Sequence, residues 1–189
     1  MTIKMEKIQE VNLLAAQRVS EHFSKLSKKS VHVEFSKVVE MKVEKITLPI
    51  PAEDLVAGVH MAIAGQLEGA ALLAFPMDVA CVLADSFLRR SPGTTKTLTD
   101  MDKSSLKEIG NIVLGGYLTV VSNILSLKTI YRVPIFCAGI LGAIVKDVHL
   151  NFARNAGTTL AIEVAIVLEA QVMKGYLLVL FKQEGFFGV

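Results

Sequence analysis

The sequence is most constrained by one mainly apolar stretch at residues 104–125, which leads into a segment ending at Pro134. Apolar side chains recur in it every three or four residues, at Leu106, Ile109, Val113, Tyr117, Val120 and Ile124. This spacing is typical of the buried face of a helix. A second stripe of the same helix carries Ser104, Glu108, Asn111 and Gly115. Because residues three or four apart are neighbours on a helix, we expect these groups to line up, with Gly115 leaving room for another surface.

Ser104, Glu108, Asn111 and Pro134 stand at the spacing Ser-x3-Glu-x2-Asn-x22-Pro. This pattern resembles the signature of the CheC/CheX/FliY family of phosphatases, and the run Lys-Glu-Ile-Gly-Asn at 107–111 resembles CheC in particular. The chain looks most similar to a stand-alone CheC-like protein with one intact motif. The resemblance implies an α+β, internally duplicated fold. Two halves related by a pseudo-two-fold axis would pack their helices on a shared, mainly antiparallel sheet.

In the chain as a whole, a helix followed by three or more strands is predicted to occur twice. We expect helices at 5–26, 77–88 and from Thr99 or Asp100 onward, since either residue could cap the third helix. Alternating or apolar runs predict strands at 31–35, 38–46, 60–67, 70–75, 129–137, 143–152, 159–170 and 176–181. Residues 89–98 are rich in Ser, Pro, Gly and Thr and predict an exposed loop.

We therefore predict one CheC-like domain over 1–189, with pseudo-repeats at about 3–88 and 99–185 joined by the loop 89–98. A shift of 99 residues aligns Asn12 with Asn111, and a shift of 106 aligns Leu72 with Leu178. The first half then holds a degenerate copy of the motif, at Met5, Gln9 and Asn12, with Phe35 in place of Pro134. Because only the Asn is kept, we expect this first site to be inactive.

Composition excludes several classes of protein. A net charge of +2 argues against a nucleic-acid binder that works through a broad basic surface. The hydrophobic content of 52% raises the alternative of a membrane-associated helical protein, and residues 109–127 carry no charge. That stretch also contains two asparagines and three glycines and lacks a basic flank or aromatic belt, so we expect no membrane span. The N-terminus has no apolar signal-peptide core, and we expect a cytoplasmic protein.

Self-contained hydrolytic chemistry has no sequence support. Ser104 has no His or Asp at a fixed partner spacing, and the glycine pair at 115–116 is not followed by a lysine as in a phosphate-binding loop. Cys81, Cys137 and the four histidines are scattered, so no metal site is predicted. What remains is positional catalysis, because a carboxamide can hold and aim a water molecule at an activated phosphoryl group.

The resemblance implies a role for each motif residue. The substrate would be the aspartyl phosphate of a CheY-like receiver, with Asn111 positioning the attacking water and Glu108 pairing with the receiver's lysine. Ser104 would contact the same surface, and Pro134 would support the strand after the helix. The chain would bind no cofactor itself, since Mg²⁺ would come from the receiver. An internal two-fold can substitute for a dimer, which favours a monomer.

The alternative is a binding module without turnover. Such a module could be an adaptor for a CheD-type deamidase, or a scaffold in the flagellar switch. The sequence contains no counterpart of the extra C-terminal domain of FliY, and this favours the phosphatase over the switch scaffold.

Overall fold

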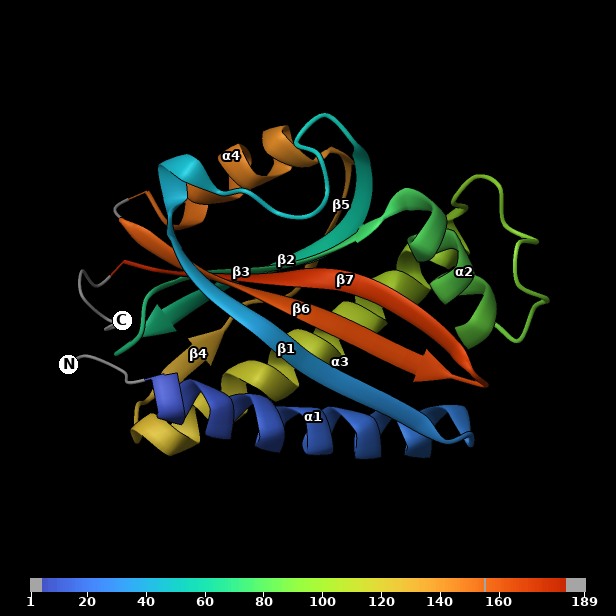
Figure 1. Ribbon diagram of the computed structural model, residues 1–189, viewed down its shortest axis with the longest axis horizontal. Helices are drawn as coiled ribbons and strands as arrows, with labels where there is room; N and C mark the ends of the chain where they lie inside the picture. Colours follow the sequence, from blue (N-terminus) through green and yellow to red (C-terminus); the bar gives the residue numbers. More distant parts are fainter. Residues whose placement is uncertain (1–4, 155, 183–189) are drawn as a thin grey trace.

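The computed structural model describes residues 5–154 and 156–182, apart from the side chain of Met5. Within these residues, seven strands form one antiparallel sheet in the order β1-β6-β7-β3-β2-β4, and β5 also pairs with β2 (Figure 1). The strands are β1 Val31–Lys42, β2 Leu55–Gly65, β3 Gly69–Pro76, β4 Thr129–Tyr131, β5 Ile135–Ile140, β6 Thr158–Leu168 and β7 Gln171–Phe181. The helices are α1 Met5–Ser27, the short η1 Val43–Lys45, α2 Met77–Phe87, α3 Asp100–Leu125 and α4 Leu141–Phe152. The mixed α+β class and the antiparallel sheet predicted from the sequence are confirmed.

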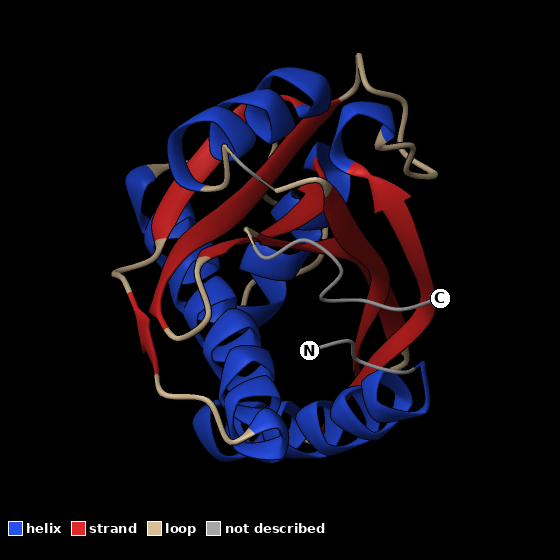
Figure 2. Ribbon diagram, turned by 90° about the vertical axis from the view of Figure 1, so that its left-hand side faces the viewer, coloured by secondary structure: helices blue, strands red, loops and turns tan. Residues whose placement is uncertain are grey.

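The sheet is covered on both faces. Helices α1, α2 and α3 pack on one face, and α4 packs on the other together with the segment that contains η1 (Figures 1 and 2). Successive side chains of a strand point to opposite faces. Along β3, Leu73 and Phe75 therefore join the core under α1 and α3, while Leu72 and Ala74 join the core under α4. This double burial explains why β3 reads as a continuous apolar run.

The sheet order is symmetric about the central pair of β3 and β7, each of which is joined by a hairpin to the next strand out. Leu72 lies opposite Leu178 in the register of this pair, and these two residues are equated by the 106-residue shift. A two-fold axis through the pair fits this register. The duplication itself stays a prediction, and its outermost residues, 3–4 and 183–185, lie outside the described part of the chain.

Three sequence-based predictions of elements need correction. Residues 143–152 form not a strand but most of the helix α4, whose Leu141 and Val148 are buried seven residues apart, two helical turns. The many β-branched and apolar residues there mimic a strand. The predicted strand at 129–137 is divided into β4 and β5, with Pro134 directly before β5. The predicted strand at 38–46 ends at Lys42, where η1 takes over.

Helix α1 buries the stripe that its periodicity predicts, at Ile8, Ala15, Val19 and Phe23. Leu26 stands at the same spacing, three residues after Phe23, but 53% of its surface is exposed, one residue before the helix ends at Ser27. In the described residues α3 alone is long and apolar enough to cross a membrane. However, 61% of its most apolar window is buried inside the fold, which is the position of a core helix.

The start of α3 is held by a buried polar cluster. Thr99 caps the helix, because its hydroxyl accepts from the backbone N–H of Asp102 while the Asp102 carboxylate accepts from the backbone N–H of Thr99 at 2.7 Å. Arg90, from the loop before the helix, bonds to the same carboxylate and lies 3.6 Å from Asp85. Asp85 in turn accepts two hydrogen bonds from Thr95. The loop that follows α2 is thereby tied to the first turn of α3.

Both buried aspartates are held ionised. Burial alone would raise the pKa of Asp102, but the hydrogen bonds from Thr99 and the charge of Arg90 outweigh it and lower that pKa. Burial would likewise raise the pKa of Asp85, but the hydrogen bonds from Thr95 and the charge of Arg90 outweigh it and lower that pKa. Carboxylates with a lowered folded-state pKa stabilise the fold above the unfolded pKa, about 3.9, and lose this contribution as the pH falls.

Asp102→Asn should therefore lower the free energy of unfolding at pH 7 and flatten its fall between about pH 4 and pH 2. Chemical denaturation at a series of pH values measures both effects. Asp100→Asn is the matched control, because Asp100 lies in the same helical turn with a fully exposed side chain (100%). Equal acid dependence in wild type and Asp102→Asn would contradict the structural role of this cluster.

Candidate functional site

The stripe predicted on α3 is on the surface of the folded protein. Ser104, Glu108 and Asn111 are exposed, while Leu106, Ile109, Val113 and Tyr117 on the other side are buried against the sheet and α1. Among the residues that the structure describes, Ser104, Glu108 and Asn111 make no side-chain hydrogen bond or ion pair within the chain. A carboxylate and a carboxamide, about 4.5 Å apart along a rigid core helix, are thus available to another molecule.

Beside Glu108 the surface is hollowed by a depression of about 370 Å³. Its walls come from three helices, with Leu26 and Ser27 on α1, Ser86 and Phe87 on α2, and Ser104, Ser105 and Glu108 on α3. The described residues that line it include no histidine. Within these residues no imidazole therefore lies beside Ser104 to act as a base.

Sequence reasoning missed Met101, which extends the exposed stripe by one turn toward the start of α3. It lies three residues before Ser104 and is 68% exposed, next to the depression. The same spacing rule that found Glu108 and Asn111 could have found it, since positions 101, 104, 108, 111 and 115 share one face.

Pro134 lies at the end of a short connection that runs beside α3. Before it, the Tyr131 hydroxyl donates to the backbone carbonyl of Leu118 on α3 at 2.6 Å. After it, Phe136 pairs with Val59 of β2, and Val59 is the residue against which Gly110 of α3 packs. The connection thus passes the middle of α3, and Pro134 directly precedes β5. Its supporting role stays a prediction.

The first-half positions have a different environment. Gln9 is exposed, but Asn12 is only 7% exposed and its Oδ1 accepts a hydrogen bond from the Tyr117 hydroxyl at 3.0 Å. The Tyr117 ring in turn packs on Phe35, with ring centroids 5.1 Å apart. The side chain of Met5 lies outside the described residues. The first asparagine is therefore a structural residue in the interior, bonded across the interface between α1 and α3.

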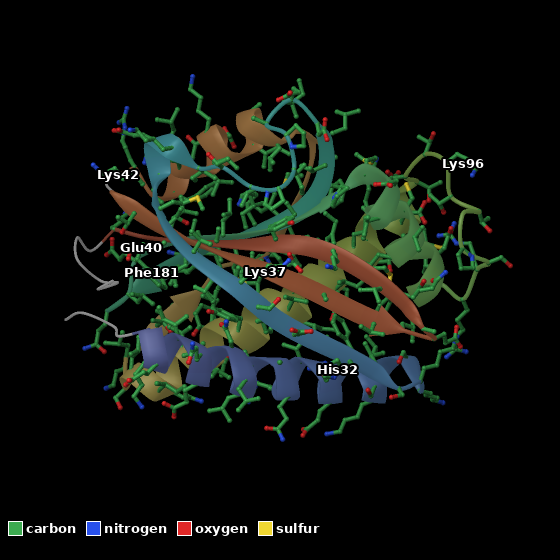
Figure 3. All side chains as sticks on the ribbon, in the orientation of Figure 1. His32, Lys37, Glu40, Lys42, Lys96 and Phe181 are labelled. Carbon is green, nitrogen blue, oxygen red and sulfur yellow. The ribbon has the colours of Figure 1, made fainter. Side chains whose placement is uncertain are left out.

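One further charged group is buried elsewhere in the sheet. Glu163 on β6 is 7% exposed and pairs with Lys37 Nζ at 3.0 Å and Lys174 Nζ at 3.2 Å. Figure 3 labels Lys37 on β1, within the irregular register between Ser36 and Val39. The hydrogen bond from Lys37 contributes most to lowering the pKa of Glu163. Because Lys37 lies 126 residues from Glu163 in the sequence, this cluster gave no sequence signal.

The described residues contain no group of three or more His, Cys, Asp or Glu side chains that could hold a metal ion. Both cysteines are free thiols, and burial raises the pKa of Cys137 to about 11. His60 packs on Phe152, with ring centroids 4.9 Å apart, and burial lowers its pKa. None of these side chains lines the depression beside Glu108.

No known family model matches the chain. It is 27% identical over 126 residues to CheC1 of Halobacterium salinarum, a protein assigned as a CheY-P phosphatase. That match covers 65% of this chain and spans 64% of the curated relative.

Solved structures share the fold over almost the whole chain. Thermotoga maritima FliY matches with a TM-score of 0.75 at 19% identity, covering 95% of this chain and 92% of that one. At this level of identity the likeness shows a shared fold. A CheX–CheY–BeF3–Mg²⁺ complex from Borrelia burgdorferi matches with a TM-score of 0.55 at 19% identity, covering 92% and 97%. A FliG–FliM complex from H. pylori matches with a TM-score of 0.68 at 13% identity, covering 94% of each chain.

The two asparagines should respond oppositely to removal of their amides. Asn12→Ala leaves the buried Tyr117 hydroxyl without its partner and should destabilise the protein by about 1–3 kcal/mol. Asn111→Ala, at an exposed helix position, should leave stability equal or slightly higher, since Ala has the higher helix propensity. Urea denaturation of both variants measures the difference. Equal stability of the two would show that the Asn12–Tyr117 bond contributes nothing.

Proposed function

We propose that this chain is a chemotaxis phosphatase that hydrolyses the aspartyl phosphate of a CheY-like receiver. The observation that carries the proposal is the pair of Glu108 and Asn111, exposed and unpartnered on one face of a buried helix, within a fold shared with FliY and CheX. The CheC1 relative supports the same activity. As a chemotaxis protein of this family it would act in the cytoplasm.

Asn111 is the proposed catalytic residue. Its carboxamide offers one donor and one acceptor, which together can hold a water molecule in line with the acyl phosphate. The oxygen of this water bonds to phosphorus while the bond from phosphorus to the aspartate oxygen breaks. Inorganic phosphate leaves, and the receiver recovers its carboxylate. Little besides orientation is needed, because an acyl phosphate is already activated.

Glu108 is proposed to pair with the receiver's active-site lysine and so fix the angle at which Asn111 enters. Ser104 would contact the same receiver surface, and Pro134 would support the adjoining connection. The Mg²⁺ ion that neutralises the phosphoryl oxygens would come from the receiver, with none bound by this chain. The first half would not turn over substrate, since its asparagine is already bonded to Tyr117. We propose a monomer as the working unit.

A scaffold role is the second candidate, because the fold also matches the FliM of a FliG–FliM complex. An adaptor for a CheD-type deamidase belongs to the same class of binding modules. A phosphatase accelerates loss of phosphate from a receiver when present at a small fraction of the receiver concentration, whereas a scaffold or an adaptor does not. Substoichiometric addition to a phosphorylated receiver therefore separates the two classes.

Asn111→Ala should still bind the phosphorylated receiver but lose roughly a hundredfold in turnover, ~2.7 kcal/mol of barrier. The matched control is Asn12→Ala, which should keep turnover per folded molecule within about twofold. Phosphate release under single-turnover conditions, with binding measured separately, tests both. Full activity of Asn111→Ala, or a loss accounted for by weaker binding, would remove the catalytic role.

Glu108→Lys should weaken receiver binding, because it would place two cations together, and added salt should partly restore it. Gln9→Lys introduces the same ammonium group, with a charge change of one instead of two, at an exposed position near the opposite end of the helix pair, and should leave binding unchanged. Titrations at low and high salt measure both variants. Unchanged binding by Glu108→Lys at low salt would exclude this residue from the interface.

A further inference from the structure

Helix α3 contains three glycines in its middle, although glycine destabilises a helix interior relative to alanine. Packing explains two of them. A Cβ at Gly110 would lie 2.5 Å from the Cβ of Val59 on β2, and a Cβ at Gly116 would lie 2.6 Å from Cγ2 of Val19 on α1. The sheet and α1 can approach α3 this closely only because no side chain is present at either position.

Gly115 has no such explanation inside the molecule. A Cβ built there would meet nothing within 4 Å, and no unusual backbone conformation calls for glycine at this position. It lies four residues after Asn111, so it is one turn further along the same stripe, and it is half-buried. Alanine would therefore fit the fold and favour the helix.

We propose that Gly115 is a close-approach contact, where the phosphorylated receiver meets the backbone of α3 in van der Waals contact. This inference rests on the proposed function. The asparagine side chain is short, so the receiver must come almost into contact with α3 for the Asn111 amide to reach a water beside the phosphorus. A side chain one turn away, about 6 Å along the helix, would hold the two surfaces apart.

The surface at the other end of the stripe fits the same occupant. Met101 and Leu26 are exposed apolar side chains beside the 370 Å³ depression, and they offer contact area for an apolar side chain of the receiver. Lys107 lies at the side of the stripe, one residue before Glu108. Within the described residues its ammonium has no ion-pair partner. This positive charge complements the anionic surface around an acyl phosphate. The contact thus extends from Met101 to Gly115, about 21 Å of helix.

The test replaces Gly115 and measures stability, binding and turnover separately. Gly115→Ala and Gly115→Leu should both melt at or above the wild-type temperature. Gly115→Leu should weaken binding of purified CheY-like receivers activated with BeF3 and Mg²⁺ by tenfold or more, with Gly115→Ala in between. Asn123→Leu is the control, because it adds the same side chain at an exposed position of α3 away from the stripe.

The outcomes are distinguishable from those that test the phosphatase. Wild-type binding without accelerated phosphate loss would contradict the phosphatase proposal, while weaker binding by Gly115→Leu would still support the contact. Binding and turnover by Gly115→Leu equal to wild type would overturn the contact and leave the phosphatase intact. A large loss of thermal stability in Gly115→Leu would also overturn it, because the position would then be packed. Failure of the wild type to bind any activated receiver would overturn both.

Discussion

The structure depends on how closely α3 packs into the protein on two of its sides. Gly110 admits β2 and Gly116 admits α1, and because a helix turns about 100° per residue, these two contacts point in directions about 120° apart. The remaining sector of the helix surface contains Met101, Ser104, Glu108, Asn111 and Gly115. The rotation of α3 is therefore set by backbone-close contacts on its buried sides. The exposed stripe keeps its direction without any contact of its own.

The two asparagines show how environment decides the role of one residue type. Asn111 is exposed and has free hydrogen-bonding capacity, whereas Asn12, at the aligned position of the first half, is bonded to the buried Tyr117 hydroxyl. That bond stabilises the packing of α1 on α3, because an unpaired buried hydroxyl would be unfavourable. An amide already used in this way is not available to hold a water for a partner. Asn12 thus stabilises the packing of α1 on α3, whereas Asn111 stays available on the surface of α3.

Local sequence patterns predict much of this fold, whereas contacts between residues distant in the sequence leave no such pattern. Helices α1, α2 and α3 follow from periodicity, and the Thr99 cap follows from its place before an apolar run. Helix α4 was mistaken for a strand, because its β-branched residues favour strands and its burial against the sheet is a tertiary effect. The face of α3 was predictable down to Glu108 and Asn111. The burial of Asn12 and the Arg90–Asp102 pair depend on residues distant in sequence, which spacing does not report.

Charge is divided between support and recognition. Asp85 and Asp102 are buried and fully partnered at the base of α3, where hydrogen bonds and Arg90 hold them ionised. Glu108 is exposed and unpartnered in the described structure, so its carboxylate is solvated before any partner arrives. An exposed ion pair contributes little, about 0–1 kcal/mol, and becomes stronger only where an interface excludes water. If the proposed function holds, a carboxylate in this position would therefore determine register and selectivity more than affinity. This arrangement suits the proposed catalysis by positioning. The buried side of α3 is held rigidly, and the side chains on its exposed side have no partner until a substrate protein would bind there.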